Sequence, residues 1–219
     1  MVPTRRLLVA IDGPAGSGKS TLAYGLAEAL SLPYVNTGLM YRALTHRALA
    51  AGVDTDDEPG LATLLEEMDF GLDGGPPATL SIDGGLPGDD LTARDVEGAV
   101  SAVARHPEVR RLMADRQREL GRHGAVMEGR DIGSVVFPDA DVKIFLDASA
   151  EERVGRRAAE RIGAKGVERE LTARDALDSR TNPFVPAPEA VRIDNTGKAP
   201  EETLQEALRI VRARAGVEP

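Results

Sequence analysis

The apolar positions of this chain fall into short runs that are separated by longer amphipathic segments. Five runs are almost continuously apolar, which is typical of strands buried on both faces of a sheet. They span Leu7–Ile11, Pro33–Val35, Ala125–Met127, Lys143–Leu146 and Val191–Ile193. Helical periodicity lies between them, as in residues 38–51, where Met40, Leu44 and Ala48 recur at a spacing of four. Strands that alternate with helices indicate a parallel sheet with right-handed crossovers, and therefore a three-layer α/β core.

The pattern changes between residues 70 and 90. Short apolar runs are interrupted there by three glycine-rich or proline-rich breaks, at Gly74–Pro77, Asp83–Gly85 and Pro87–Gly88. Breaks of this kind are typical of small antiparallel hairpins. We therefore predict an inserted subdomain over residues 61–100, between two parts of one core at residues 1–60 and 101–219.

The most specific motif follows the first predicted strand. The segment GPAGSGKS from Gly13 to Ser20 has the GxxxxGKS spacing of a phosphate-binding loop (P-loop), and an apolar helical stripe follows it. Glycines allow the backbone N–H groups to converge on phosphate oxygens, and the following helix adds its positive end. Lys19 would reach the β- and γ-phosphates, and the Ser20 hydroxyl would ligate the Mg²⁺ that travels with a nucleotide. The alternative, a glycine-rich turn with a chance lysine, does not account for the flanking strand and helix. The candidate phosphate-binding residues are Gly13, Pro14, Ala15, Gly16, Ser17, Gly18, Lys19, Ser20 and Thr21.

Charge and composition narrow the range of partners. The chain has 27 Lys and Arg against 36 Asp and Glu, for a net charge of −9. This argues against nucleic acid as a main partner, because binding to a phosphate backbone needs a basic face. The absence of cysteine excludes disulfides, zinc–thiolate sites and a cysteine nucleophile. Met1–Arg6 is too short and polar for a signal peptide, and no apolar run approaches the ~20 residues that span a bilayer. We expect a cytoplasmic, monomeric protein that contacts no membrane.

Three arginines recur at a spacing of four on one face of a predicted helix. They are Arg153, Arg157 and Arg161, and no acidic residue lies among them on that face. Like charges at this spacing repel by a few tenths of a kcal/mol, a cost that a bridging anion would reverse. This favours a phosphate-facing lid over about residues 153–171, with a solvated face as the alternative. Arg156 has acidic residues at a spacing of four on both sides, which favours surface ion pairs.

Further polar clusters lie where predicted strands end, which is where open α/β sheets bind ligands. They comprise Thr37 and Arg42 after the second strand, and Arg130 and Asp131 after the third. A simple ion pair is an equally good interpretation of Arg130 and Asp131 by themselves. Arg174, Asp178 and Arg180 form another cluster at near-helical spacing, for which ordinary pairing within a helix is the alternative.

Taken together, these motifs resemble a known family. The sequences IDGPAGSGKST, NTGLMYR, EGRDIGSVVFPDADVKIFLDAS and SAEERVGRR are similar to those of bacterial cytidylate kinases, which are nucleoside monophosphate kinases within the P-loop kinases. The resemblance covers nearly the whole chain. It implies a five-stranded parallel sheet, a small inserted antiparallel subdomain that binds the monophosphate, and a short lid. It also implies that the γ-phosphoryl group of ATP is transferred to CMP or dCMP, with Mg²⁺ accompanying the ATP.

The resemblance also implies roles for individual residues. Lys19 and the lid arginines Arg153 and Arg157 would be catalytic, with Gly13–Thr21 holding ATP. The CMP site would consist of Thr37, Arg110 and Asp131 at the base, Arg42, Arg130, Arg174 and Arg180 at the phosphate, and Asp178 at the ribose. Cytosine has an amino donor at N4 beside two acceptors, so a carboxylate can accept from N4 while an arginine donates. Uracil has a carbonyl at that position, which would leave the Asp131 carboxylate unsatisfied at a cost of about 1–3 kcal/mol or more.

Two other functions are compatible with the P-loop alone. A shikimate-like kinase would need arginines that bind a carboxylate, and it gives no reason for the inserted hairpins. A nucleotide switch comparable to a small GTPase would need an NKxD motif, which this sequence lacks. The DxxG sequence at Asp57–Gly60 has no predicted strand before it, so we interpret it as a chance match.

Overall fold

A computed structural model describes residues 7–159, 168, 172, 175–177 and 185–216 of the chain. Its strands are β1 (Leu8–Asp12), β2 (Tyr34–Asn36), β3 (Phe70–Asp73), β4 (Thr79–Ile82), β5 (Ala125–Gly129), β6 (Val142–Asp147) and β7 (Val191–Asp194). Its helices are α1 (Lys19–Leu30), α2 (Thr37–Ala51), α3 (Glu58–Glu66), α4 (Arg94–Val103), α5 (Pro107–Gly121), α6 (Ala150–Ala159) and α8 (Pro200–Ala215). Two short helical turns, η1 (Asp89–Thr92) and η2 (Ile132–Val136), complete the described elements. Within the described ranges, none of the helices combines the length and apolar character needed to cross a bilayer.

The strands of the described chain form one sheet in the order β3-β4-β2-β5-β1-β6-β7. The five strands from β2 to β7 in this order are parallel, and each overlaps one of the five apolar runs found in the sequence. Strand β1 is the middle one of these five strands and is buried along its whole length, as its continuous apolar run indicates. Because the five strands are parallel, their carboxyl ends share one edge of the sheet, and the loops that follow them meet there.

The sheet is mixed and has seven strands, so the prediction of a five-stranded parallel sheet is wrong in this detail. The predicted hairpin is present as the antiparallel strands β3 and β4, in which Phe70 lies opposite Ile82 and Asp73 lies opposite Thr79. Strand β4 also pairs in parallel with β2, and Tyr34 N donates to Ala78 O at 2.8 Å. The hairpin therefore extends the sheet, because pairing with β4 satisfies backbone groups that an edge strand would leave open.

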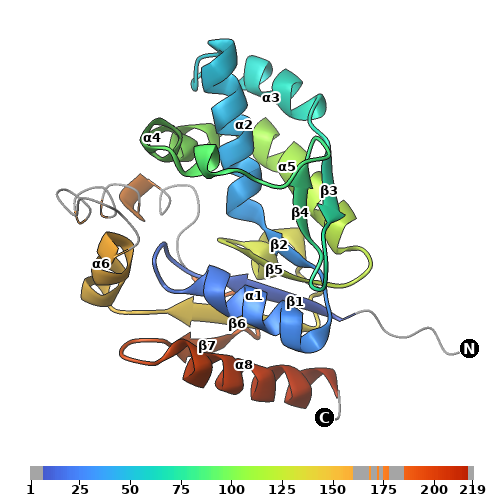
Figure 1. Cartoon of the computed structure of the whole chain (residues 1–219), viewed down its shortest axis with the longest axis vertical. Helices are drawn as coiled ribbons and strands as arrows, with labels where there is room; N and C mark the ends of the chain where they lie inside the picture. Colours follow the sequence, from blue (N-terminus) through green and yellow to red (C-terminus); the bar gives the residue numbers. More distant parts are fainter. Residues whose placement is uncertain (1–6, 160–167, 169–171, 173–174, 178–184, 217–219) are drawn as a thin grey trace, which may run out of the picture.

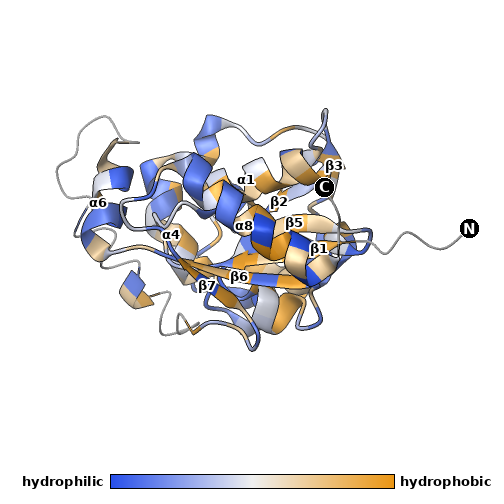
Figure 2. Cartoon of the chain, turned by 90° about the horizontal axis from the view of Figure 1, so that it is seen from below, coloured by the Kyte–Doolittle hydropathy of each residue, from blue (hydrophilic) through white to orange (hydrophobic). Residues whose placement is uncertain are grey.

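Helices cover both faces of the sheet, which gives the three layers that the sequence predicted (Figure 1). On one face, α2, α3 and α5 pack through residues such as Met40, Leu65 and Met113. On the other face, α1 and α8 pack through residues such as Leu26 and Leu208. Figure 2 shows the hydrophobic residues concentrated on the strands between these helices. Both faces being covered explains why the strands are continuously apolar rather than alternating.

Helices α4 and α6 lie on the same side of the molecule, beyond the carboxyl ends of the strands (left in Figure 1). Helix α4 packs against α2 and η1. Helix α6 follows β6 directly and begins where the Ser149 hydroxyl accepts a hydrogen bond from Glu152 N at 3.2 Å. The candidate functional residues lie on these two helices, on α5, and in the loops after β1, β2 and β5 together with the first turns of α1 and α2.

Candidate active site

The P-loop between β1 and α1 depends on its glycines for both conformation and space. Gly18 has φ of 96°, in the left-handed region that residues with a side chain rarely adopt. A Cβ atom on Gly18 would lie 2.8 Å from Asn195 Nδ2, and one on Gly13 would lie 2.1 Å from Leu146 O. Helix α1 begins directly after Gly18, so its free N–H groups point into the curled loop. The loop therefore has the form of an anion-binding cradle.

Lys19 lies inside this loop. Its side chain is buried, and Nζ donates to Pro14 O at 2.7 Å. An ammonium held by a backbone carbonyl keeps its charge at the centre of the cradle until stronger acceptors arrive. Ser20 and Thr21, the next two residues, are exposed and line the same cavity as Lys19.

Two side chains from distant parts of the chain hold the P-loop in place. Asn195, after β7, donates from Nδ2 to Ser17 O at 2.8 Å. Arg156 of α6 donates to the same carbonyl at 3.2 Å and to Asn195 O at 2.8 Å. Arg156 also pairs with Glu152 at 3.0 Å, as its spacing predicted. The predicted ion pair is therefore confirmed, and the other hydrogen bonds of Arg156 in addition join α6 to the P-loop.

Asp12 connects the P-loop strand to the loop that follows β5. Its buried carboxylate accepts hydrogen bonds from Ile132 N and Gly133 N, both at 2.8 Å. These bonds fix the start of η2, immediately after Asp131. Burial raises the pKa of Asp12 to about 6, the two N–H groups oppose this rise, and the charge of Asp131 adds to it.

The opposite end of the cavity is built around an ion pair. Arg110 of α5 donates from Nη2 to Oδ2 of Asp131. Thr37, the first residue of α2, donates from its hydroxyl to Glu128 O at 2.7 Å. Arg130 donates from Nη1 to Gly13 O at 3.1 Å, so it reaches back towards the P-loop. The structure thus brings together residues that the sequence placed after separate strands.

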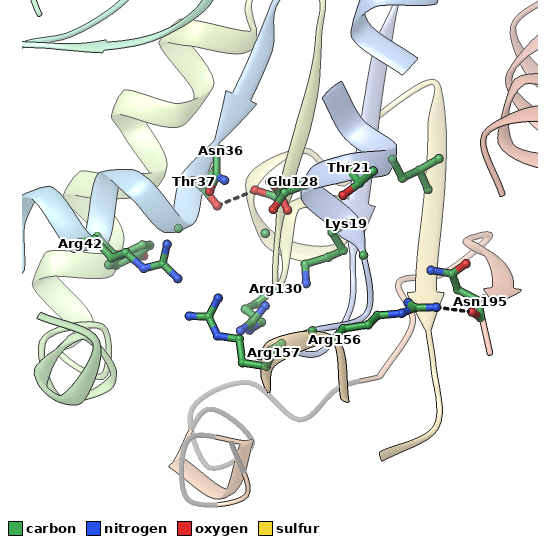
Figure 3. A pocket seen from close by; sticks show the side chains of 18 of the residues that line it. Lys19, Thr21, Asn36, Thr37, Arg42, Glu128, Arg130, Arg156, Arg157 and Asn195 are labelled. Carbon is green, nitrogen blue, oxygen red and sulfur yellow. Dashed lines mark hydrogen bonds between the residues drawn. The ribbon is translucent and has the colours of Figure 1, made fainter. Parts of the chain in front are cut away.

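One cavity of about 600 Å³ joins these two groups of residues. Of the predicted P-loop residues it is lined by Ala15, Gly16, Gly18, Lys19, Ser20 and Thr21, whereas Gly13, Pro14 and Ser17 do not line it. Of the other predicted residues it is lined by Thr37, Arg42, Arg110, Arg130, Asp131 and Arg157. Figure 3 shows the side chains of Lys19, Arg42, Arg130 and Arg157 around a common space. Positive charge is therefore concentrated between the two ends of the cavity.

Arg153 and Arg157, the two described arginines of the predicted lid face, have different surroundings. Arg157 lines the main cavity and pairs with Glu97 of α4. Arg153 instead donates to Ala15 O at 3.1 Å and pairs with Asp175 at 2.5 Å, beside a separate cavity of about 500 Å³. Their spacing of four predicted a shared face, but their partners separate them. The predicted residues Arg174, Asp178 and Arg180, and the third arginine of the face, Arg161, lie outside the described residues.

Sequence reasoning missed Glu128 as a functional candidate. Its buried carboxylate accepts from the Tyr34 hydroxyl at 2.5 Å, and it lines the cavity together with Ser20. Burial raises the pKa of Tyr34 well above its usual value, and the Glu128 carboxylate adds to this rise, so Tyr34 remains a donor. The available signal was a carboxylate at the end of a buried strand next to the P-loop strand.

A strand, P-loop and helix at the carboxyl edge of an α/β sheet, with arginines across the same cavity, define a P-loop phosphate-binding protein. Comparison with known proteins identifies the family. The family model described as cytidylate kinase matches residues 9–213. Cytidylate kinase of Geobacillus kaustophilus (strain HTA426) is 47% identical over 225 residues, covering 97% of this chain and 99% of that protein. Cytidylate kinase of Geobacillus thermodenitrificans (strain NG80-2) is 46% identical, with the same coverage. Among solved structures, TT1252 from Thermus thermophilus is 24% identical with a TM-score of 0.48, covering 95% of this chain and 97% of its own. The chain belongs to the cytidylate kinase family.

Proposed function

We propose that this protein transfers the γ-phosphoryl group of ATP to CMP or dCMP, giving ADP and CDP or dCDP, as a step of pyrimidine nucleotide metabolism. The observation that carries the proposal is a single cavity with a P-loop at one end and the Arg110–Asp131 pair at the other. A donor and an acceptor nucleotide held in one cavity can be aligned for direct transfer, which supplies a large part of the rate enhancement in such reactions.

The donor end would bind the phosphates of ATP. The N–H groups of Gly13–Thr21 and the start of α1 favour anions, and Lys19 would exchange the carbonyl of Pro14 for phosphate oxygens. Arg157 would add charge from the lid side, where it already faces the cavity. We assign Arg153 to holding α6 against the loop, because its hydrogen bond to Ala15 O makes that contact.

The acceptor end would bind the pyrimidine monophosphate. Asp131 would accept from the cytosine N4 amino group through the carboxylate oxygen that Arg110 does not engage, and Arg110 would donate to N3 or O2. Thr37 already donates to Glu128 O, so its hydroxyl is oriented as an acceptor towards the base. Arg42 and Arg130 would hold the monophosphate. By family resemblance, Arg174 and Arg180 would assist them, and Asp178 would bind the ribose.

The residues around Ser20 fit a Mg²⁺ ion that arrives with ATP. Mg²⁺ usually takes one or two protein oxygens and completes its shell with phosphates and water. Ser20 offers a hydroxyl and Glu128 a carboxylate on the same cavity. In the described part of the chain, no cluster of three or more acidic or histidine side chains could hold a metal without a nucleotide. The ion would neutralise charge on the β- and γ-phosphates.

Catalysis needs no general base in this arrangement. The attacking oxygen belongs to a phosphate that is already anionic, so the protein has to align the two nucleotides, neutralise charge and exclude water. Lys19 and Arg157 are the described cations placed to neutralise the transferred group, and removal of such a stabiliser typically costs ~10²-fold or more in rate.

We also propose how the chain as a whole supports this reaction. Residues 61–100 would act as the monophosphate-binding insert, and about residues 153–171 as the lid. We propose a monomer that acts on small-molecule substrates, and the net charge of −9 supports such substrates rather than nucleic acid. We place the reaction in the cytoplasm, where its nucleotide substrates are found.

A spectrophotometric assay of ADP release tests the proposal. The purified chain, with ATP and Mg²⁺, is offered CMP, dCMP, UMP, AMP and shikimate in separate reactions. We expect turnover to be fastest with CMP or dCMP, and the Lys19→Ala variant to lose at least ~10²-fold in kcat while keeping its circular dichroism spectrum. Preference for another acceptor, or near-normal turnover by Lys19→Ala, would contradict the proposal.

A further inference from the structure

Gln117 is a largely buried glutamine of α5 that is in contact with the main cavity. Its side chain is 3% exposed. Within the described part of the chain, its amide makes no hydrogen bond. The amide nitrogen and oxygen are not among the fully buried polar atoms that lack a partner in the described part of the chain, so they are accessible from the cavity, where a ligand group can reach them.

The position of Gln117 places it at the acceptor end of the cavity. It follows Arg110 by seven residues, which is two turns of α5, so both side chains lie on one face of the helix. Arg110 on that face forms an ion pair with Asp131. Gly129, two residues before Asp131 in the sequence, also lines the cavity. The Gln117 amide therefore belongs to the same end of the cavity as the ion pair that would select the base.

We propose that Gln117 is a further base-recognition residue for the pyrimidine monophosphate. The inference rests on the proposed function, because it takes the Arg110–Asp131 end as the acceptor site. A primary amide carries an acceptor oxygen and two donor hydrogens, and a half-turn of the group exchanges them. Gln117 can therefore accept from the 4-amino group of cytosine or donate to the 4-carbonyl of uracil.

Gln117 and Asp131 would then have different roles at one base. The Asp131 carboxylate only accepts, so it favours cytosine over uracil. Nothing in the described structure pins the Gln117 amide in one orientation, so it adds affinity for either pyrimidine without choosing between them. Replacing it by a group that only accepts should turn this permissive contact into a selective one.

Steady-state kinetics with CMP and with UMP test this role. Gln117→Leu keeps a similar size and removes all hydrogen bonding, so we expect KM for both monophosphates to rise about fivefold or more, with KM for ATP unchanged. The ratio of kcat/KM for CMP to that for UMP should stay within about twofold of the unmodified protein. Gln117→Glu only accepts, so we expect that ratio to rise about tenfold.

Two control variants separate base recognition from a structural role. Gln205→Leu makes the same substitution on an exposed position of α8, outside the residues that line the cavity, and should leave all kinetic constants unchanged. Asp131→Ala should lower the CMP-to-UMP ratio, which is opposite to the effect of Gln117→Glu. If Gln117 had only a structural role, Gln117→Glu would change stability or kcat without changing the ratio of kcat/KM for CMP to that for UMP.

Calorimetric binding of CMP and UMP keeps this inference distinct from the proposed function. If the unmodified chain binds CMP but does not phosphorylate it, the proposed function fails, and the Gln117 variants are still judged by their affinities. Unchanged monophosphate affinity in Gln117→Leu, or an unchanged CMP-to-UMP ratio in Gln117→Glu, would overturn the role of Gln117. Absence of CMP binding to the unmodified chain would overturn both.

Discussion

Single residues at this site act mainly through buried groups that link one loop to another. Asp12 illustrates this, because its carboxylate satisfies two backbone N–H groups of η2 and thereby fixes the loop that carries Asp131. Sequence inspection placed Asp12 in the P-loop segment but gave no sign of this contact. Ile132 and Gly133 follow Asp12 in the sequence by 120 and 121 positions. No local sequence pattern encodes a pairing over such a separation.

The raised pKa of Asp12 predicts a specific pH dependence of stability. An aspartate whose folded pKa is about 6 binds its proton more tightly in the folded chain than in the unfolded chain, where the pKa is near 3.8. Its contribution to the free energy of unfolding is therefore greatest below about pH 4 and falls as the pH rises to about 6. Relative to Asp12→Asn, the unmodified protein should lose up to about 3 kcal/mol over this range. Urea unfolding of both proteins from pH 4 to 7 measures the difference, and a difference that does not change with pH would contradict the assignment.

The P-loop could be predicted residue by residue, whereas the surrounding contacts could not. The GxxxxGKS spacing is local, so Lys19 and Ser20 were recognisable from the sequence and lie on the cavity. Glu128 and Gln117 carry no motif of their own, and their importance depends on burial beside a cavity that only the fold creates. The division between Arg153 and Arg157 likewise depends on their partners, because both have the same helical spacing.

At the scale of elements, the sequence predicted the parallel strands better than it predicted how the β3–β4 hairpin pairs with them. The five apolar runs became the five parallel strands because burial on both faces requires continuous apolar character. The hairpin of β3 and β4 was predicted from its turns, but its attachment to β2 was not. That attachment is made by backbone groups at Tyr34 and Ala78, which side-chain patterns do not specify.

Among the contacts between elements, the ion pair that joins α4 to α6 has the clearest functional consequence. Glu97 of α4 pairs with Arg157 of α6, and Arg42 Nη2 of α2 lies 3.7 Å from the same carboxylate oxygen. The Glu97 side chain is 7% exposed, so this carboxylate bridges two arginines within a partly dry space. If these arginines bind phosphate, the Glu97 carboxylate occupies a position for which the incoming anion must compete.

Removing the charge of Glu97 should therefore strengthen binding of the acceptor. We expect Glu97→Gln to lower KM for CMP about fivefold, because the phosphate no longer has to displace a carboxylate or approach its charge. The exposed Glu151→Gln on α6 is the matched control and should leave KM unchanged. Steady-state kinetics at fixed ATP measure both variants. A rise in KM for CMP in Glu97→Gln would show instead that Glu97 holds the arginines in their binding positions.

At the scale of the whole molecule, the layered fold explains where the cavity lies. Two apolar clusters fill the opposite faces of the sheet, with α2, α3 and α5 on one side and α1 and α8 on the other (Figure 1). The carboxyl edge of the sheet is left for loops, and these loops carry the P-loop and the Arg110–Asp131 pair. The three-layer architecture could be deduced from the sequence, but the joining of both groups in one cavity required the structure.

The central claim is that one cavity holds the phosphate donor and the pyrimidine acceptor together. An adenosine–cytidine compound with the two nucleosides joined by five phosphates tests this directly in a calorimetric titration. The account predicts that one molecule binds per chain, and that saturation with this compound abolishes the binding of both ATP and CMP. Continued binding of CMP to the saturated protein would show that the two sites are separate and would contradict the claim.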